Sequence, residues 1–397
     1  SFYSWMTINN RCFYSFRIMQ ILSLYILIPF SVKKCDYCDF LSAPASEEVK
    51  ERYMQALFSE IKSRGKRFAN CRTETVFIGG GTPNVIAPEK IRELLEHVRE
   101  AFHVCGDAEI TMELNPGAAG GTEAFRQYKE AGINRLSIGL QSAKDEELRL
   151  LGRIHTFSQF EKTWSEAREA GFTNLNADLI YALPGQTVES WRQTLETVCA
   201  AGPEHISAYG LILEEGTPFF ERYASLTKAE EEKREERDRQ MYALTERVLS
   251  EAGYARYEIS NYAREGKACR HNLVYWNRGE YLGVGTGAAS LINNTRFNNT
   301  SDLITYIQNH GIFPYQNIQS LSEQEQMEEF MFLGLRLIKG VEMERFRRLF
   351  HKEIESVYGA VLEKNYRDGL LKCEDGRIFL TSRGLDLSNY VSAQFLF

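Results

Sequence analysis

The chain of 397 residues is long enough for two or three domains, and its 43% hydrophobic and 25% charged residues are typical of a globular protein. With 47 Lys and Arg against 54 Asp and Glu, its net charge of −7 provides no bulk attraction to nucleic acid or anionic lipid. Its eight cysteines include only one close pair, Cys35 and Cys38, which argues against a disulfide scaffold and favours a reducing, cytoplasmic compartment.

The N-terminal region contains an apolar run over 18–30 that is too short for a membrane span. This run also lacks the small-residue cleavage site of a signal peptide, so we expect neither a span nor a leader. Residues 22–28 are predicted to form a buried strand. Residues 1–18 show no clear period and are treated as an N-terminal extension without an assigned role.

Strand-like and helical patterns alternate from residue 22 to about 210. The expected strands are 22–28, 75–78, 110–114, 135–138, 174–180 and 205–209. The expected helices are 47–64, 88–102, 122–131, 144–151, 157–170 and 188–200. Such alternation predicts an α/β fold with a parallel sheet, and six strands suit a partial (β/α)6 TIM-type barrel. In such barrels the chemistry gathers at the carboxyl ends of the strands.

The remaining sequence predicts a long charged helix over 226–252 and a change of character near 316. Helices over 322–339, 342–350 and 354–365 precede a hairpin of 370–373 and 378–381 and a final helix, which indicates a small α+β, winged-helix-like domain. Without a basic surplus, nucleic-acid binding by this domain is not expected. The predicted organisation is therefore an extension 1–18, a barrel 19–255, a connecting segment 256–315 and a C-terminal domain 316–397.

Two motifs follow the first two predicted strands. Cys35 and Cys38, separated by two residues, could bind one metal ion or iron–sulfur cluster, but the spacing alone also fits a redox motif or chance. No second Cys/His pair appears at the spacing of a zinc site, and a thioredoxin motif would begin a helix in a much smaller domain. The run Gly79-Gly80-Gly81-Thr82-Pro83 allows backbone N–H groups to approach a ligand, although a tight structural turn explains it as readily.

Polar residues mark the next three predicted strands. Glu113 ends the third strand, Gln141 follows the fourth and Asp178 lies within the fifth. A single polar residue on a buried strand is usually a hydrogen-bonding core residue. Because the carboxyl ends of parallel strands meet at one edge, the whole series is better explained as a binding site.

Seven motifs in this order resemble the radical S-adenosylmethionine (SAM) superfamily, and within it the group of oxygen-independent coproporphyrinogen oxidases and HemW haem chaperones. The resemblance extends from about residue 22 to 395. The motifs are Tyr25-Ile-Leu-Ile-Pro-Phe, Cys35-Asp-Tyr-Cys-Asp-Phe, Gly79-Gly-Gly-Thr-Pro, Glu113-Leu-Asn-Pro, Gly139-Leu-Gln-Ser, Gly152-Arg-Ile-His and Asp178-Leu-Ile-Tyr-Ala-Leu-Pro-Gly.

The resemblance implies a 4Fe–4S cluster held by three cysteines spaced C-x3-C-x2-C, with SAM bound at the fourth iron. It assigns the cluster positions to Ser31, Cys35 and Cys38 and assigns no catalytic residue. The residues that it implies around SAM are Tyr25, Tyr37, Gly80, Gly81, Thr82, Glu113, Gln141, Arg153, Asp178 and Ala289.

The sequence departs from this pattern at two positions. Ser31 occupies the first cysteine position, and Leu27 stands where the family usually has histidine. A serine hydroxyl is a harder ligand than a thiolate and ionises less readily, and the next thiol upstream is Cys12. We therefore expect a labile, incomplete or missing cluster, and the sequence leaves open whether the chain is an enzyme.

Two features favour the HemW branch. Phe40 occupies the position of a further cysteine in the oxidases, and His271-Asn-Leu-Val-Tyr-Trp276 resembles the H-N-x-x-Y-W motif in which the histidine is associated with haem. Taken alone, His271 is more readily explained as a hydrogen-bonded core histidine; the resemblance implies that it binds haem.

The function implied by this branch is a cytoplasmic haem chaperone that hands haem to acceptor proteins, with peripheral contact to membrane-bound acceptors left open. The alternative is oxidative decarboxylation of coproporphyrinogen III to protoporphyrinogen IX. A third reading is a degenerate barrel that binds neither cofactor nor haem.

Overall fold

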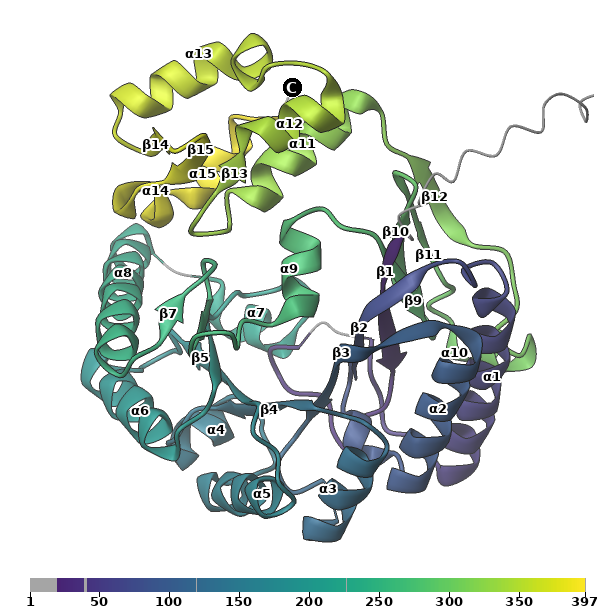
Figure 1. Ribbon diagram of the computed structural model, residues 1–397. Coiled ribbons are helices and arrows are strands. Elements are labelled where there is room, and N and C mark those ends of the chain that lie inside the picture. The colour runs from purple at the N-terminus through teal and green to yellow at the C-terminus, as the bar shows by residue number, and fades with distance from the viewer. Residues whose placement is uncertain (1–19, 39–40, 119, 226, 397) are drawn as a thin grey trace, which may run out of the picture.

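The computed structural model describes residues 20–38, 41–118, 120–225 and 227–396 (Figure 1). The predicted extension 1–18, which contains Cys12, and Phe40 lie outside the described residues.

Six parallel strands form a partial barrel and are hydrogen-bonded in chain order, as the sequence predicted. They are β1 (Ile21–Ile28), β2 (Arg72–Gly80), β3 (His103–Leu114), β4 (Arg135–Gln141), β5 (Leu175–Tyr181) and β6 (His205–Gly210). β2 and β3 begin earlier than the apolar runs that predicted them, because Arg72 and Thr73 pair with His103 and Val104 ahead of those runs.

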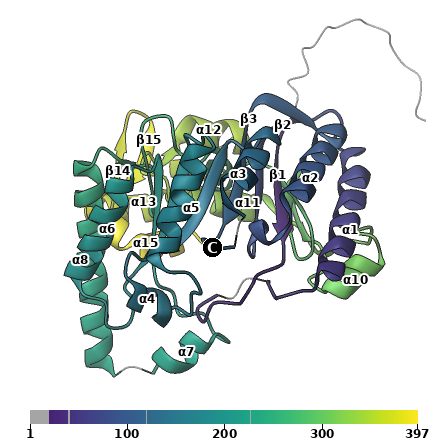
Figure 2. The same cartoon turned by 90° about the horizontal axis from the view of Figure 1, so that it is seen from below.

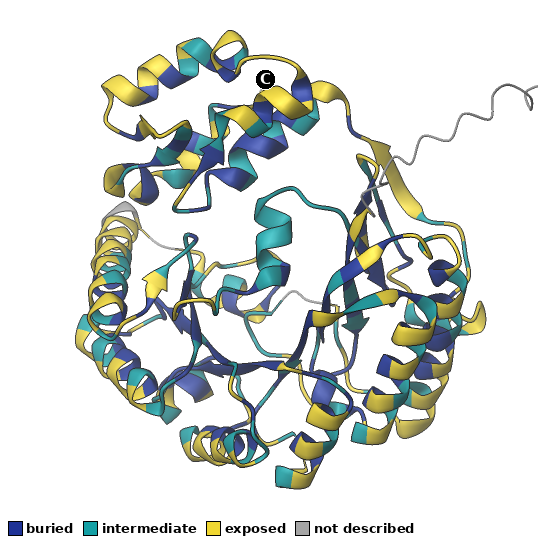
Figure 3. Cartoon of the chain, in the orientation of Figure 1, coloured by how far each residue is buried: buried dark blue, intermediate teal, exposed yellow. Residues whose placement is uncertain are grey.

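An outer ring of helices covers the barrel (Figure 1). It consists of α1 (Glu47–Gly65), α2 (Pro88–Ala101), α3 (Gly121–Glu130), α5 (Phe157–Glu169), α6 (Val188–Ala201) and α8 (Lys228–Glu251). The shorter η1 (Pro83–Val85), α4 (Asp145–Leu150) and α7 (Pro218–Tyr223) belong to the loops after the strands. The ring helices expose their outer faces, whereas the strands between them are largely buried (Figure 3).

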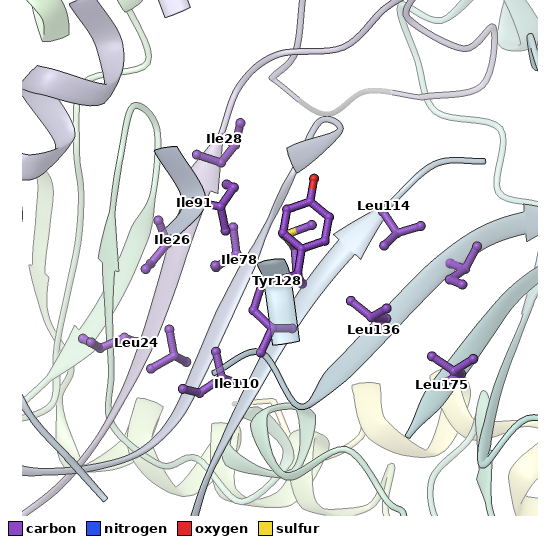
Figure 4. Packing of buried hydrophobic residues seen from close by; sticks show 14 of the residues in the cluster. Leu24, Ile26, Ile28, Ile78, Ile91, Ile110, Leu114, Tyr128, Leu136 and Leu175 are labelled. Carbon is purple, nitrogen blue, oxygen red and sulfur yellow. The ribbon is translucent and has the colours of Figure 1, made fainter. Parts of the chain in front are cut away.

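The main core lies between the sheet and this ring. Leu24, Ile26 and Ile28 of β1 and Ile78 of β2 pack in this core together with Ile91 of α2 (Figure 4). Successive side chains of a strand point to opposite faces, so the residues between them, including Tyr25, face the barrel interior. One face of each strand therefore stabilises the fold while the other is available for the site.

Residues 255–320 extend the sheet at both edges to twelve strands. β7 (Ala255–Arg256) and β8 (Asn261–Ala263) are antiparallel additions beside β6, β9 (Tyr281–Val284) runs parallel to β1, and β10 (Ala289–Ile292), β11 (Thr295–Asn298) and β12 (Gln316–Ser320) follow as antiparallel strands. The helices α9 (Arg270–Trp276) and α10 (Leu303–Gln308) lie between these strands in the chain. The sequence did not predict these six strands.

The C-terminal region has its own hydrophobic core, which includes Phe330, Phe346 and Ile378. Its elements are α11 (Glu323–Gly334), β13 (Val341–Glu342), α12 (Met343–Phe350), α13 (Ile354–Arg367), β14 (Leu371–Glu374), β15 (Arg377–Leu380), α14 (Ser382–Asp386) and α15 (Ser388–Ala393). The three strands pair antiparallel in the order β13-β15-β14. The observed α+β arrangement agrees with the predicted one, although the helix predicted over 322–339 ends at Gly334.

Within the described parts of the chain, every helix is too short or too polar to cross a membrane.

Candidate functional site

A cavity of about 430 Å³ opens at the carboxyl ends of the barrel strands. The loop after β1, α4 and α7 gather at this end of the barrel (Figure 2). Most of the residues singled out from the sequence line this one cavity, namely Ser31, Cys35, Tyr37, Cys38, Gly80, Gly81, Thr82, Glu113, Gln141, Arg153 and Asp178.

The glycine run after β2 brings the backbone against Glu113. The Gly80 N–H donates to Glu113 Oε2 at 3.1 Å. A Cβ on Gly79 would lie 2.7 Å from the same oxygen, and Gly80 has a φ of 112°, which favours glycine. This run is therefore more than a turn, because it is needed for close contact between the backbone and the carboxyl group.

Glu113 is the most strongly perturbed acid of the cavity. Burial, and secondly the charge of Asp178, raise its pKa to about 8, against the opposing effects of the Gly80 N–H and Arg135. The carboxyl group is thus largely protonated at neutral pH, and a cationic ligand group beside it would favour ionisation. Such a buried, perturbed acid in a cavity is typical of a binding or catalytic site.

Arg153 and Asn115 form a second polar centre. Arg153 Nη2 donates to Asn115 Oδ1 at 2.6 Å and to the Gly139 carbonyl at 2.7 Å. Asn115 Nδ2 in turn donates to Thr82 Oγ1 at 2.7 Å. Gln141, where β4 ends, has a φ of 73°, an unfavourable conformation for a residue other than glycine. The network holds the guanidinium in a fixed position, where it can bind a carboxylate.

Asp178 is held by two neighbours. Its carboxylate accepts hydrogen bonds from Ser137 Oγ at 2.9 Å and Asn176 Nδ2 at 2.9 Å. The sequence analysis did not assign Asn115 or Ser137 to the site, although both line the cavity. Asn115 could have been found because it belongs to the Glu-Leu-Asn-Pro motif, whereas Ser137 carries no such signal.

The two predicted cluster cysteines lie in one turn, in which the Cys38 N–H donates to the Cys35 carbonyl at 3.2 Å. Arg153 Nη1 lies 3.5 Å from Cys35 Sγ. Ser31 lines the same cavity, and its buried Oγ has no hydrogen-bond partner among the described residues. The three positions thus face one space, but one donor is an unpartnered hydroxyl instead of a thiol.

This donor set does not fit a cluster bound by three thiolates. No group of three or more His, Cys, Asp or Glu side chains suited to a metal ion occurs among the described residues. A neutral serine hydroxyl is a poor substitute for the soft thiolate that iron–sulfur clusters require. The polar part of the cavity fits SAM better, since Glu113 suits an ammonium group, Arg153 a carboxylate and Asp178 a ribose hydroxyl.

Two residues predicted to contact SAM are absent from the cavity lining. Tyr25 lies in the barrel interior, where its ring stacks on Phe77 with centroids 5.9 Å apart. Burial, and secondly the charge of Glu113, raise its pKa. Ala289 is an exposed residue at the start of β10. The predicted contacts of these two residues with SAM stay predictions.

His271 is also absent from the cavity lining. It is buried at the start of α9, with Nδ1 hydrogen-bonded to Thr75 Oγ1 at 2.8 Å and Nε2 to Tyr275 Oη at 2.9 Å. Burial, and secondly Arg135, lower its pKa to about 3, so the ring is neutral at physiological pH. His271 thus has the hydrogen bonds of a core histidine, which was the alternative to haem binding in the sequence analysis. If either ring nitrogen is to bind haem iron, one of these hydrogen bonds must break.

Comparison with known proteins places these observations in a family context. Residues 25–198 match the radical SAM superfamily, and residues 321–387 match the HemN C-terminal domain. The chain is 34% identical over 379 residues to the heme chaperone HemW of Bacillus subtilis, covering 94% of this chain and 99% of that protein. It is 38% identical over 271 residues to the heme chaperone HemW of Escherichia coli, covering 67% and 69% of the two chains.

A solved structure shares the fold over nearly the whole chain. This is coproporphyrinogen III oxidase (HemN) from Escherichia coli, a radical SAM enzyme, with a TM-score of 0.82 and 25% identity. The match covers 95% of this chain and 90% of the oxidase.

Proposed function

The chain belongs to the HemW family within the radical SAM superfamily, and from this premise we propose that it binds haem and transfers it to acceptor proteins. The observation that carries this proposal is the match to a heme chaperone across 99% of that protein's length. The unpartnered Ser31 hydroxyl supports it further, because a chaperone can act without the radical initiation that an oxidase needs.

We assign the polar part of the cavity to SAM. Glu113 would bind the ammonium group with the backbone of Gly80 and Gly81 alongside, and Arg153 would bind the carboxylate. Gln141 and Asp178 would hold the ribose. In radical SAM proteins the cluster supplies the electron that cleaves SAM. We assign no such step to this chain, because its described residues offer two thiols instead of three.

The oxidase is the second candidate, favoured by the TM-score of 0.82 with HemN. Its radical chemistry would depend on the ligand set that Ser31 interrupts. Anaerobic incubation of reconstituted protein with coproporphyrinogen III and SAM distinguishes the two functions. Sustained formation of protoporphyrinogen IX would favour the oxidase over the chaperone.

The proposed partners are haem and haem-acceptor proteins, reached by peripheral contact where an acceptor is membrane-bound. We place the chain in the cytoplasm because its few scattered cysteines suit a reducing compartment.

The direct test is a haem titration followed by transfer. We expect a saturable change in the Soret band of haemin on adding the full chain, and faster delivery to apomyoglobin from this complex than from haemin bound to albumin. Failure to saturate, or transfer no faster than from albumin, would contradict the chaperone function.

A further inference from the structure

Large apolar side chains surround the mouth of the barrel cavity. Ile212 is 69% exposed, Ile154 55%, Val32 54% and Tyr209 39%. Tyr209 lies near the end of β6 and Ile212 in the loop that follows this strand, and both line the cavity itself. Val32 and Ile154 line an adjoining hollow that shares Lys33, Cys35 and Arg153 with the cavity. An exposed apolar surface continuous with a cavity marks a site for a ligand or partner.

The hollow surface continues beyond the cavity on the β6 side. A further space of about 440 Å³ shares Leu211 and Ile212 with the cavity. Its other lining residues are Leu213, Phe220, Ala224, Glu231 and Arg234. The recess at this end of the barrel is therefore wider than its polar centre. The polar groups Glu113 and Arg153 lie in the central cavity, whereas the exposed apolar side chains lie at its mouth.

Two lysines stand among these apolar side chains. Lys33 and Lys34 are exposed and line the cavity, and neither side chain makes a hydrogen bond or ion pair with any described residue. Asp36 in the same loop is paired with Arg222 instead. In a chain with a net charge of −7, two unpaired cations beside an apolar rim form a local site for an amphiphilic anion.

Haem has the complementary chemistry, since it is a flat apolar ring with two carboxylates at one edge. His271, by contrast, is buried inside the protein. Only 1% of His271 is exposed. Glu109 accepts hydrogen bonds from the backbone N–H groups of Arg270 at 3.0 Å and His271 at 3.1 Å, and these bonds fix the start of α9.

We propose that haem docks across the mouth of the barrel cavity, with its ring against Val32, Ile154, Tyr209 and Ile212 and its propionates on Lys33 and Lys34. These six residues are called the mouth surface. This inference rests on the proposed haem-chaperone function and gives that function a location. Haem at the mouth surface lies over the polar cavity, so a ligand in that cavity and haem are in contact or compete. His271 then has a structural role in holding α9.

The test is a titration of the full chain with haemin, in which binding is measured from the change in Soret absorption. Ile212→Asp and the double variant Lys33→Glu/Lys34→Glu are each expected to weaken binding by at least about tenfold, because they place charge against the ring or remove both propionate partners. Ile318→Asp is the matched control, since Ile318 is 65% exposed on the edge strand β12, away from the mouth. We expect this control to bind haemin like the unmodified chain.

A footprint tests the location without any substitution. Cys35 lines the cavity under the mouth surface, whereas Cys373 is exposed in the C-terminal domain. Bound haemin is expected to slow alkylation of Cys35 by iodoacetamide and to leave Cys373 unaffected. His271→Asn, with its fold checked by circular dichroism, is expected to bind haemin with unchanged affinity.

The outcomes separate this inference from the function on which it rests. Saturable binding that is unaffected by the mouth-surface variants, or that is lost in a folded His271→Asn protein, would overturn the location and leave the chaperone function standing. An absence of saturable binding to the unmodified chain would overturn both.

Discussion

At the scale of single residues, Glu113 controls the charge of the cavity. Its pKa of about 8 lies above the ordinary 4.5, so the folded state favours the protonated acid. Glu113 ionises near pH 4.5 in the unfolded chain but only near pH 8 in the folded chain. Its contribution to the free energy of unfolding is therefore fully present below pH 4.5 and is lost as the pH rises through about 8. Glu113→Gln, which stays neutral, should therefore exceed the unmodified chain in free energy of unfolding by at least about 1 kcal/mol at pH 9 and match it below about pH 4.

Denaturant unfolding at several pH values measures this difference. Glu100→Gln provides the control, because Glu100 has a 77% exposed side chain. A parallel pH profile for Glu113→Gln and the unmodified chain would refute the assignment of a buried, protonated Glu113.

The same acid should make ligand binding depend on pH. S-adenosylhomocysteine carries the amino-acid end of SAM and needs no cluster for the comparison. If its ammonium group binds Glu113, affinity should rise between pH 6.5 and 8.5 as the carboxylate forms, by roughly threefold to tenfold. Isothermal titration should show weaker binding and a flat profile for Glu113→Gln; an equally steep profile in that variant would point to another titrating group.

Ser31 determines whether a cluster can be held. Ser31→Cys should restore the third thiolate and raise iron towards about four per chain after anaerobic reconstitution. Ser42→Cys is a matched control, because Ser42 lines the same cavity outside the cysteine motif. Iron, sulfide and electron paramagnetic resonance measurements decide the result. Full iron content in the unmodified chain would show that serine or another ligand already suffices.

At the scale of secondary-structure elements, the sequence predicted what is encoded locally. β1 to β6 are buried apolar runs separated by amphipathic helices, and the polar residues at their ends converge because parallel strands place their carboxyl ends together. β12 carried no such signal, since all five of its residues are exposed and it forms only by pairing with β11. The placement of α9 depends on Glu109, which is more than a hundred residues earlier in the chain, so the motif around His271 could not reveal its burial.

Glu109 is expected to control the stability of α9. Its carboxylate lies at the start of this helix, where negative charge is favourable, and it accepts the two backbone N–H groups at 3.0 and 3.1 Å. Glu109→Gln should cost about 1–2 kcal/mol and speed hydrogen exchange in α9. Glu74→Gln, which removes the more exposed contacts of Glu74 with Arg270 at 3.7 Å and with Arg72 at 3.0 Å, should cost less than about 1 kcal/mol. Equal effects of the two changes would contradict this role of Glu109.

At the scale of the whole molecule, the barrel and the C-terminal region have separate hydrophobic cores and meet through charged contacts. Glu329 of α11 binds Arg278 at 2.9 Å and Arg296 at 2.7 Å. Arg336 lies 4.3 Å from the ring centroid of Trp276, and Arg345 Nη2 donates to the Asn277 carbonyl. The C-terminal region therefore packs on the end of α9, whereas the carboxyl ends of the strands carry the cavity.

This arrangement predicts that a substitution can weaken the packing of the C-terminal region on the barrel without changing the affinity for haem. Glu329→Gln would leave the largely buried Arg278 without its carboxylate and should lower the free energy of unfolding by about 2–4 kcal/mol. Scanning calorimetry should show a lower transition, or two transitions where the unmodified chain has one. Glu323→Gln, which breaks an exposed pair with Lys352, should change the free energy of unfolding little.

Because the mouth surface lies at the strand ends, Glu329→Gln should bind haemin with unchanged affinity at temperatures below its unfolding transition. A parallel loss of affinity would instead place haem beside α9 and the C-terminal region.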